Sequence, residues 1–205
     1  EIDLINDNSN GGYTFTYSSN FASNTNATAA FERAIDTWRC DISANLDIST
    51  TNTSTNCAAN DGINLISFDN NCVLGTGVLA QTTQHYTSCT NGDAFFHEMD
   101  IIFSNTSNTT WNFGPDATVS GEKDFESIAL HELGHTLGMG HVLDYGKVMY
   151  PSLANATDIR DLDTDAADCG DLIVAHSIIA NNCASSTPMT LYTCSTCNDG
   201  ILNGN

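Results

Sequence analysis

The sequence predicts an α/β (α+β) domain, and three observations support this prediction. Residues 13–17, YTFTY, alternate aromatic residues with threonine, as a half-buried strand does. An amphipathic helical segment follows, and several short strand-like segments come after it. The order strand, helix, strands is the beginning of an α/β arrangement. A chain of 205 residues is long enough to bury a real core.

The first helix is expected within residues 26–40, NATAAFERAIDTWRC, with Asn26 or Thr28 as its N-cap. Its apolar residues recur at helical spacing and form one stripe: Phe31, Ala34, Ile35 and Trp38. The next segment, DISANLDIS, predicts a second strand because its apolar residues alternate: Ile42, Ala44, Leu46 and Ile48. Further strands are expected at 63–68, 77–82 and 94–104.

The second half of the chain is expected to be mainly helix and loop. Residues 104–121 are rich in Asn, Thr and Gly and predict a surface loop. Residues 121–138, GEKDFESIALHELGHTLG, predict a helix, with acidic residues at its start where the helix dipole favours them. A last helix is expected within 163–180, interrupted or kinked near Gly170.

Charge and cysteine content restrict the function. Five basic and 25 acidic residues give 5 − 25 = −20, which argues against binding nucleic acid or an anionic membrane. No stretch approaches the roughly 18 apolar residues of a membrane span.

Eight dispersed cysteines predict disulfides and an oxidising compartment, with 105 possible pairings for four bridges. The close pair Cys194 and Cys197 favours a structural bridge. Since no signal peptide is visible, we expect a mature or excised portion of a secreted protein.

The segment HELGHTLGMGH, residues 131–141, predicts a metal site. On a helix, His131 and His135 differ by about 40° in direction and about 6 Å in height, so both imidazoles can reach one ion. Zinc accepts such nitrogens at roughly 2.0–2.1 Å. Glu132 is rotated by about 100° from His131, so it is placed to reach a water molecule on the open side of the metal.

A third ligand requires the chain to turn back. Gly138 can adopt the positive φ that ends a helix, and His141 then returns beneath the metal. Gly140 is expected to keep this return path free of side-chain clashes. Three protein nitrogens and one water are the open arrangement of a catalytic zinc.

The pattern H-E-x-x-H-x-x-G-x-x-H followed by a methionine turn resembles that of the metzincin metallopeptidases. Three features are most similar to the matrixin branch, here of a secreted, bacterial type: the segment HELGHTLGMGH, the spacing of eight positions between His141 and Met149, and the segment VMYPSL. AFERAIDTW, EMDIIFS and DFESIALHELGH also resemble, in order, its first helix, edge strand and active-site helix. The resemblance covers about residues 13–175 and is highly specific over 128–153.

The resemblance implies one catalytic zinc ion bound by three histidines, with Glu132 as the general base and Met149 as the floor beneath the metal. The zinc ligands would be His131, His135 and His141. The wall of the pocket for the residue after the cleaved bond would be formed by Tyr150, Pro151, Ser152 and Leu153. Structural calcium is a further expectation, with candidate ligands Asp93, Glu98 and Asp100.

The resemblance also implies the fold. It predicts a twisted, mixed, five-stranded sheet, two long helices above the cleft, and a small irregular C-terminal part with one helix. The catalytic domain would span residues 1–190, with an upper subdomain at about 1–138 and a lower one at about 139–190. Residues 191–205 would form a cysteine-bearing tail or linker. The substrate would lie antiparallel along an edge strand near 94–104.

The chain departs from the family pattern at several positions. Val142 stands where matrixins usually have serine, and eight cysteines stand in a domain that has no disulfides in vertebrate members. A second zinc is not expected, since only His85 and His97 are available in the sheet region. His85 and His176 are interpreted as ordinary surface or satisfied histidines. The acidic run at Asp161, Asp163 and Asp165 lacks the glycine and glutamate of a calcium loop, which favours a solvated helix start.

These observations predict a secreted, extracellular zinc endopeptidase that acts on protein or peptide substrates. We expect a monomer with no membrane span and no nucleic-acid partner. Two alternatives remain: a non-catalytic binding module or adhesin on the same fold, and a zinc hydrolase acting on a non-peptide amide. Loss of Glu132 would indicate the binding module, and Glu132 is present.

Overall fold

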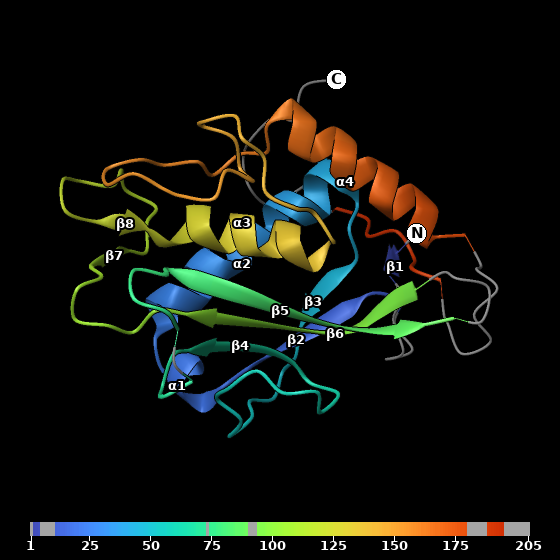
Figure 1. The fold of residues 1–205 in the computed structure, drawn as a ribbon, viewed down its shortest axis with the longest axis horizontal. Coiled ribbons are helices and arrows are strands. Elements are labelled where there is room, and N and C mark those ends of the chain that lie inside the picture. The colour runs from blue at the N-terminus through green and yellow to red at the C-terminus, as the bar shows by residue number, and fades with distance from the viewer. Residues whose placement is uncertain (1, 5–10, 73, 90–93, 180–187, 195–205) are drawn as a thin grey trace.

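A computed structural model describes residues 2–4, 11–72, 74–89, 94–179 and 188–194 of the chain. A mixed sheet lies on one side, and helices cover one of its faces (Figure 1). The strands of this sheet are β1 (Ile2–Leu4), β2 (Tyr13–Tyr17), β3 (Leu46–Ile48), β4 (Asn64–Phe68), β5 (Ala80–Ser88) and β6 (Ala94–Phe103). A separate pair joins β7 (Trp111–Asn112) and β8 (Lys123–Asp124). The helices are α1 (Ser19–Ala22), α2 (Thr25–Ile42), α3 (Phe125–Thr136) and α4 (Thr164–Ser177).

The five strands expected from the sequence are present in the order β3-β2-β4-β6-β5, and β1 adds a sixth. The first four of these strands run parallel, whereas β5 pairs with β6 antiparallel. The strands β1 and β4 pair with different parts of β6: Ile2 is opposite Ala94, and Ile66 is opposite Ile101. The predicted mixed α/β fold is therefore confirmed.

The edge strand was predicted in the wrong place. β6 pairs with β5 along its whole length, and it also pairs with β4 and with β1. Residues 94–103 therefore form an internal strand. Its mostly apolar sequence agrees with this position, since internal strands are buried on both faces. β5, AQTTQHYTS, is the edge strand. The expected strand at 77–82 captured only its beginning, because the polar residues that follow show no apolar alternation.

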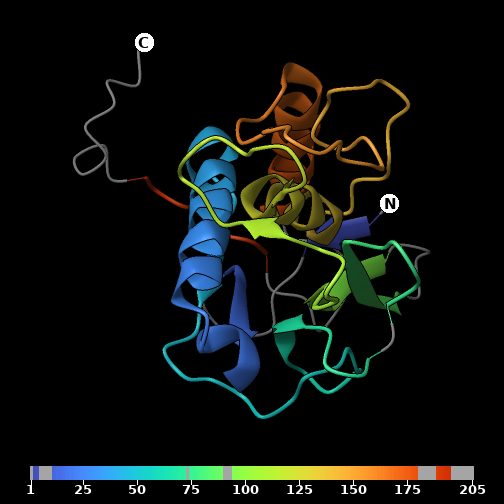
Figure 2. The same ribbon diagram turned by 90° about the vertical axis from the view of Figure 1, so that its left-hand side faces the viewer.

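The helix α2 lies against the sheet (Figure 2). Its apolar stripe is buried in the hydrophobic core. Trp38 and Phe31 are both completely buried on this face. The helix begins earlier than predicted, because the side chain of Asn24 accepts the backbone N–H of Ala27 at 3.1 Å and acts as the N-cap. Asn26 and Thr28 therefore lie inside the helix.

The end of α2 also explains why the second strand is shorter than predicted. Ile42 is the last helical residue, and Ser43 has a left-handed conformation with φ of +57°. Only Leu46–Ile48 pairs with β2, where Leu46 lies opposite Tyr13. The alternation seen from Ile42 onward thus spans a helix end and a turn as well as a strand.

The last helix, α4, continues through Gly170 without interruption, contrary to the prediction. A Cβ at Gly170 would lie 2.6 Å from Ile42 Cδ1 and 3.2 Å from Trp38 Cζ3. The glycine therefore serves close packing of α4 on α2 and does not interrupt the helix. Asp163 caps the start of α4 by accepting N–H groups of Asp165 and Ala166, so the acidic run is a helix start as interpreted.

Disulfides tie two distant parts of the chain to the fold. Cys40 in α2 pairs with Cys194, and Cys57 pairs with Cys72 across the loops that flank β4. The favoured bridge between Cys194 and Cys197 is therefore wrong. Cys89 is also disulfide-bonded, whereas Cys169 is free and exposed. The expectation that all eight cysteines form bridges is therefore wrong. Within the described residues, no helix is sufficiently long and apolar to cross a membrane.

Candidate functional site

The helix α3 carries the histidine motif, and a buried charge fixes its start. Asp124 is completely buried and caps the helix: its Oδ2 accepts the N–H of Ser127 at 2.9 Å. The guanidinium of Arg160 holds the same carboxylate through Nε at 3.1 Å and Nη2 at 2.6 Å. Such bidentate, charge-assisted contacts restrict orientation more than a single bond does. The beginning of α3 is thus joined to the loop that follows the methionine turn.

Contacts with α2 position the middle of α3. Trp38 donates from Nε1 to the carbonyl of Leu130 at 3.0 Å, and both residues are buried. Arg33 of α2 forms a 2.6 Å ion pair with Glu126. Since α3 is buried over almost its whole circumference, its sequence is apolar on several faces and does not show a single stripe.

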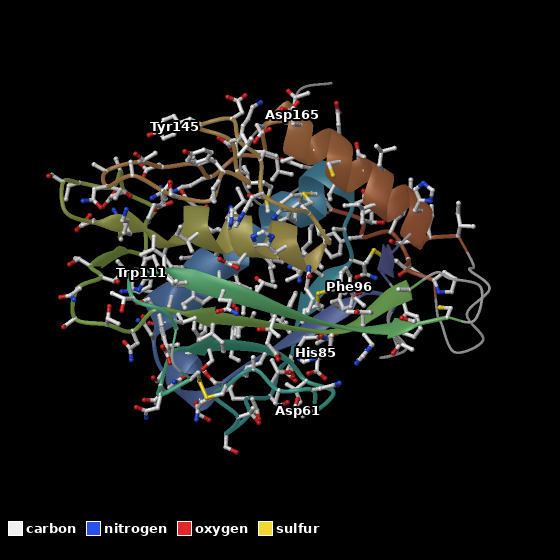
Figure 3. All side chains as sticks on the ribbon, viewed as in Figure 1. Asp61, His85, Phe96, Trp111, Tyr145 and Asp165 are labelled. Carbon is white, nitrogen blue, oxygen red and sulfur yellow. A yellow bond between two sulfur atoms is a disulfide. The ribbon has the colours of Figure 1, made fainter. Side chains whose placement is uncertain are left out.

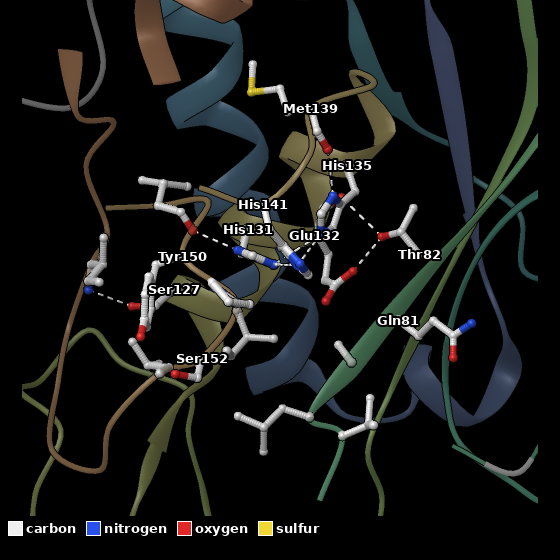
Figure 4. A pocket seen from close by; sticks show the side chains of 18 of the residues that line it. Gln81, Thr82, Ser127, His131, Glu132, His135, Met139, His141, Tyr150 and Ser152 are labelled. Carbon is white, nitrogen blue, oxygen red and sulfur yellow. Dashed lines mark hydrogen bonds between the residues drawn. The ribbon is translucent and has the colours of Figure 1, made fainter. Parts of the chain in front are cut away.

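Three histidines converge in the structure (Figure 4). The Nε2 atoms of His131, His135 and His141 are separated by 3.1, 3.1 and 3.3 Å. Nitrogens bound to one tetrahedral zinc at about 2.0–2.1 Å would be separated by about 3.3 Å. The spacing therefore fits a zinc ion between the three rings, and these histidines form a group that could hold a metal.

The remaining ring nitrogens of two histidines have carbonyl partners. His131 Nδ1 lies 2.7 Å from the Val148 carbonyl, and His135 Nδ1 lies 2.7 Å from the Met139 carbonyl. Because a carbonyl only accepts, each Nδ1 carries the proton and each Nε2 keeps its lone pair for a metal. Burial lowers the pKa of His131 to about 4 and also lowers the pKa of His135. Both rings are therefore held in the neutral form that binds metal.

A turn after α3 returns the chain to His131 and His135, so that His141 lies beside them. Gly138 has φ of +85°, as predicted, and a Cβ there would lie 3.2 Å from Phe96 Cε2. Gly140 has an ordinary φ, and a Cβ there would meet no heavy atom within 4 Å. The expectation that Gly140 prevents a side-chain clash is therefore wrong. The turn depends on Gly138.

Met149 lies against the face of α3 below the histidines. A Cβ added at Gly134 would lie only 2.3 Å from Met149 Sδ, so the missing side chain allows this contact. Met149 is 3% exposed, and its carbonyl accepts the N–H of Val142 at 2.9 Å. This hydrogen bond joins the segment after His141 to the methionine turn. Met139 and Met99 are buried in the hydrophobic core.

Glu132 faces the cleft beside the histidines and contacts β5. Thr82 Oγ1 donates to Glu132 Oε2 at 2.6 Å and lies 3.1 Å from the Glu132 carbonyl. Burial raises the pKa of Glu132 to about 7, although hydrogen bonds to its carboxyl group from the side chain and the backbone of Thr82 oppose the shift. A carboxyl group with a pKa near neutrality is suited to accept and release a proton. Gln84 of β5 donates to the carbonyl of His135 and is a second link between the strand and α3.

The cleft has a volume of about 840 Å³ and lies between β5, α3 and the methionine turn. One part of it extends from the histidines along the first turns of α3, past Ser127 and Ile128. The opposite wall of this part contains four residues singled out from the sequence: Tyr150, Pro151, Ser152 and Leu153. The Tyr150 ring packs edge-on against Tyr145, with centroids 5.4 Å apart.

A second cluster lies on the sheet face away from the helices, where Figure 3 shows His85 and Asp61. Glu98 and Asp100 are 0% and 1% exposed, and His85 Nε2 lies 3.7 and 3.8 Å from their carboxylates. This nitrogen is buried without a hydrogen-bond partner among the described residues, so the interpretation of His85 as satisfied is wrong. His176 is exposed, as predicted. Asp93 lies outside the described residues.

Sequence reasoning missed several residues of the cleft, among them Thr82, Gln84 and Lys123. Thr82 and Gln84 contact α3 from the edge strand, and Lys123 lies in the cleft at the start of α3. Thr82 and Gln84 are two positions apart, so a correctly placed β5 would have put both on one face. No local signal marks Lys123, because its place depends on how the methionine turn folds.

Comparison with known families agrees with this geometry. Residues 6–171, well over half of the chain, match the family model described as Matrixin. The chain belongs to the matrixin family. Zinc is the metal that this family implies, and the three histidines supply a site with suitable spacing for it.

Several curated relatives are similar over a short segment. The chain is 47% identical to metalloendoproteinase 1-MMP of Arabidopsis thaliana over 58 residues, which are 27% of this chain and 16% of the relative. It is 41% identical to metalloendoproteinase 1 of Glycine max over 61 residues, 28% of this chain and 20% of the relative. It is 44% identical to matrix metalloproteinase-2 of Drosophila melanogaster over 46 residues, 22% and 6% respectively. The matched segments thus span a fifth or less of each relative. The bacterial type expected from the sequence stays a prediction.

Proposed function

We propose that this matrixin is a secreted zinc-dependent endopeptidase that hydrolyses internal peptide bonds. One observation carries the proposal: three histidine nitrogens at metal-ligand spacing and the Glu132 carboxyl group face the same cleft. Beside it lies β5, which among the described residues pairs with β6 alone. The relatives named as metalloendoproteinases support the same activity. The disulfides support an extracellular location. We also propose that the protein is a monomer.

The chain's own residues perform most of the proposed reaction. His131, His135 and His141 would hold the zinc through Nε2. A bound zinc would polarise the scissile carbonyl and lower the pKa of a water molecule. Glu132 accepts a proton from the attacking water and then passes it to the departing amine. The hydroxyl of Thr82 orients the Glu132 carboxyl group for both transfers.

We propose that the substrate binds as an extended strand along β5. The strand β5 pairs on one side with β6 and borders the cleft with residues 80–82 and 84. A peptide that pairs with its free edge would gain main-chain hydrogen bonds without regard to sequence. The side chain after the cleaved bond would then enter the part of the cleft between α3 and residues 150–153.

The test compares the zinc-loaded protein with its Glu132→Gln variant on an unfolded protein substrate. Zinc content and new α-amino groups are measured in parallel. We expect the variant to keep zinc and to lose activity by about 10²–10⁴-fold, the usual contribution of a general base. Glu32→Gln, on the exposed face of α2, is the matched control and is expected to retain activity.

Three results would contradict the proposal. If both proteins bind zinc and neither releases α-amines from any protein or peptide, the fold serves as a binding module. If a non-peptide amide is hydrolysed while proteins are not, the chain is a different zinc hydrolase. Full activity of Glu132→Gln would remove the assigned general base.

For calcium we propose Glu98 and Asp100 as ligands, since their carboxylates lie together on the outer face of the sheet. Two buried carboxylates are costly without a nearby cation. Four backbone N–H groups already donate to them, from Ala59, Asp61, Gly62 and Leu65. Calcium should raise the unfolding temperature of the wild type and not that of Glu98→Gln. An equal rise in both would refute the assignment.

A further inference from the structure

Lys123 differs from every other basic side chain in this acidic protein. The chain has five Lys and Arg residues against 25 Asp and Glu residues. Four of the five form ion pairs at 3.2 Å or less: Arg33, Arg39, Lys147 and Arg160. Lys123 alone has no ion pair among the residues that the structure describes, although acidic residues outnumber basic ones fivefold. An unpaired ammonium in such a chain is available to an external anion.

This ammonium lies in the cleft, in the part that extends away from the histidines. Lys123 precedes α3 by two residues, and its Nζ donates to the carbonyl of Leu153 on the opposite wall. That single bond leaves two of the three ammonium donors for other partners. Partial burial lowers the pKa of Lys123, which agrees with a position inside the wall of the cleft.

The neighbours of Lys123 in the cleft do not neutralise it. Asp124 is engaged by Arg160, and Ser127 Oγ donates to Asp124 and accepts the N–H of Ile159. Lys147, the other lysine that lines the cleft, is paired with Asp163 and Asp165. The end of the pocket next to Lys123 is therefore the place in the cleft with an uncompensated positive charge.

We propose that Lys123 selects substrates with an acidic side chain immediately after the cleaved bond. This inference rests on the proposed peptidase function and names the substrate class for its pocket. A substrate carboxylate would receive the free donors of Nζ as a charge-assisted hydrogen bond. Without that partner, a ligand that fills the pocket would leave a desolvated ammonium, which disfavours apolar side chains.

The position of Lys123 also predicts which acid is preferred. The helix α3 rises by about 9 Å from Phe125 to His131, so the ammonium lies well beyond the metal position. A side chain that enters beside His131 must be long to reach it. Glutamate is therefore expected to be preferred over aspartate, and over glutamine, which has the same shape without the charge.

The experiment uses the zinc-loaded protein and four peptides that differ only after one cleavable bond, with Glu, Gln, Asp or Leu at that position. Mass spectrometry fixes the cleaved bond, and kcat/KM is measured for each peptide. We expect kcat/KM for the Glu peptide to exceed that for the Gln peptide by about tenfold, which corresponds to about 1.4 kcal/mol. The Asp peptide should lie between them.

Variants separate charge recognition from support of the wall. Lys123→Met should abolish the preference for Glu over Gln, and Lys123→Arg should keep it. Lys147→Met is the matched control, since it removes a paired lysine from the same cleft, and the preference should remain. Equal loss of kcat/KM on all four peptides in Lys123→Met would show that the lysine only supports Leu153, and would overturn the inference.

The outcomes distinguish this inference from the proposed function. Cleavage of the Gln and Leu peptides at least as fast as the Glu peptide would overturn the inference and leave the peptidase proposal intact. Absence of cleavage of all four peptides, together with unfolded protein, would overturn both.

Discussion

Replacing Arg160 by methionine removes the guanidinium that holds the start of α3. Arg160 donates to both oxygens of Asp124, at 3.1 and 2.6 Å, and to the carbonyls of Pro115 and Asp116 at 2.6 and 3.0 Å. Asp124 is 0% exposed, so water cannot replace the lost donors without a rearrangement. Methionine fills similar space without a charge, which makes the substitution a test of the pair itself.

The structure sets the expected magnitude. Breaking a buried ion pair by removing one partner costs about 3–5 kcal/mol, because the other charge stays buried. Asp124 keeps the N–H and Oγ of Ser127 at 2.9 and 2.5 Å and the hydroxyl of Thr118 at 3.3 Å. The guanidinium is also partly exposed, at 19%. These two facts place the expected loss of unfolding free energy at the lower end, about 3 kcal/mol.

Urea unfolding of the zinc-saturated protein measures this loss from the transition midpoint and slope. The variants are Arg160→Met, Asp124→Asn and the double variant, which form a double-mutant cycle. The double variant should lose less than the sum of the single losses, since asparagine leaves no buried charge. Additive losses, or a loss below about 1 kcal/mol for Arg160→Met, would refute the reasoning.

Three further predictions concern the site and the helix that follows it. Gly134→Ala should lower the free energy of unfolding by about 1–3 kcal/mol and weaken zinc retention against a chelator, because the added Cβ would lie 2.3 Å from Met149 Sδ. Gly140→Ala is the control and should be nearly neutral, because its Cβ would have no neighbour within 4 Å. Removing zinc should lower the unfolding temperature, and added zinc should restore it in a concentration-dependent way, whereas a constant temperature would contradict a native-state site. The pKa of Asp163 is below its usual 3.8: burial opposes the shift, but the N–H groups of Val148 and Ala166 and the Lys147 ammonium outweigh it. The ionised form therefore stabilises the fold above the unfolded pKa, and this contribution is lost as the pH falls through the lower folded pKa. The stability advantage of wild type over Asp163→Asn should shrink below about pH 4 in urea unfolding at several pH values, and an advantage independent of pH would contradict this cause.

Local chemistry predicted the part of the site that one segment encodes. The spacing of His131 and His135 on a helix and the turn at Gly138 are determined by residues within eleven positions of each other. The three nitrogens do converge, at 3.1–3.3 Å. The burial of Phe31 and Trp38 was also predicted correctly, because helical periodicity is likewise encoded within one segment.

The errors arose where distant parts of the chain decide the local structure. Gly170 suggested a break in α4, whereas its small size serves packing against Ile42, a contact across 128 positions (170 − 42). The edge strand was assigned to residues 94–104 from the family resemblance, whereas the mostly apolar sequence of that segment indicates an internal strand. Cys194 pairs with Cys40 and not with a neighbour, since spatial proximity in the fold selects among the possible pairings.

The free edge of β5 also affects how copies of this protein behave toward each other. Unpaired backbone groups on an edge strand can join the same strand of a second molecule, and such a dimer would block its own cleft. The net charge of −20 opposes this approach while the solution is dilute in salt. Salt shortens the range of the repulsion to about 3 Å at 1 M. Self-association and loss of activity are therefore expected to increase together with protein concentration and ionic strength.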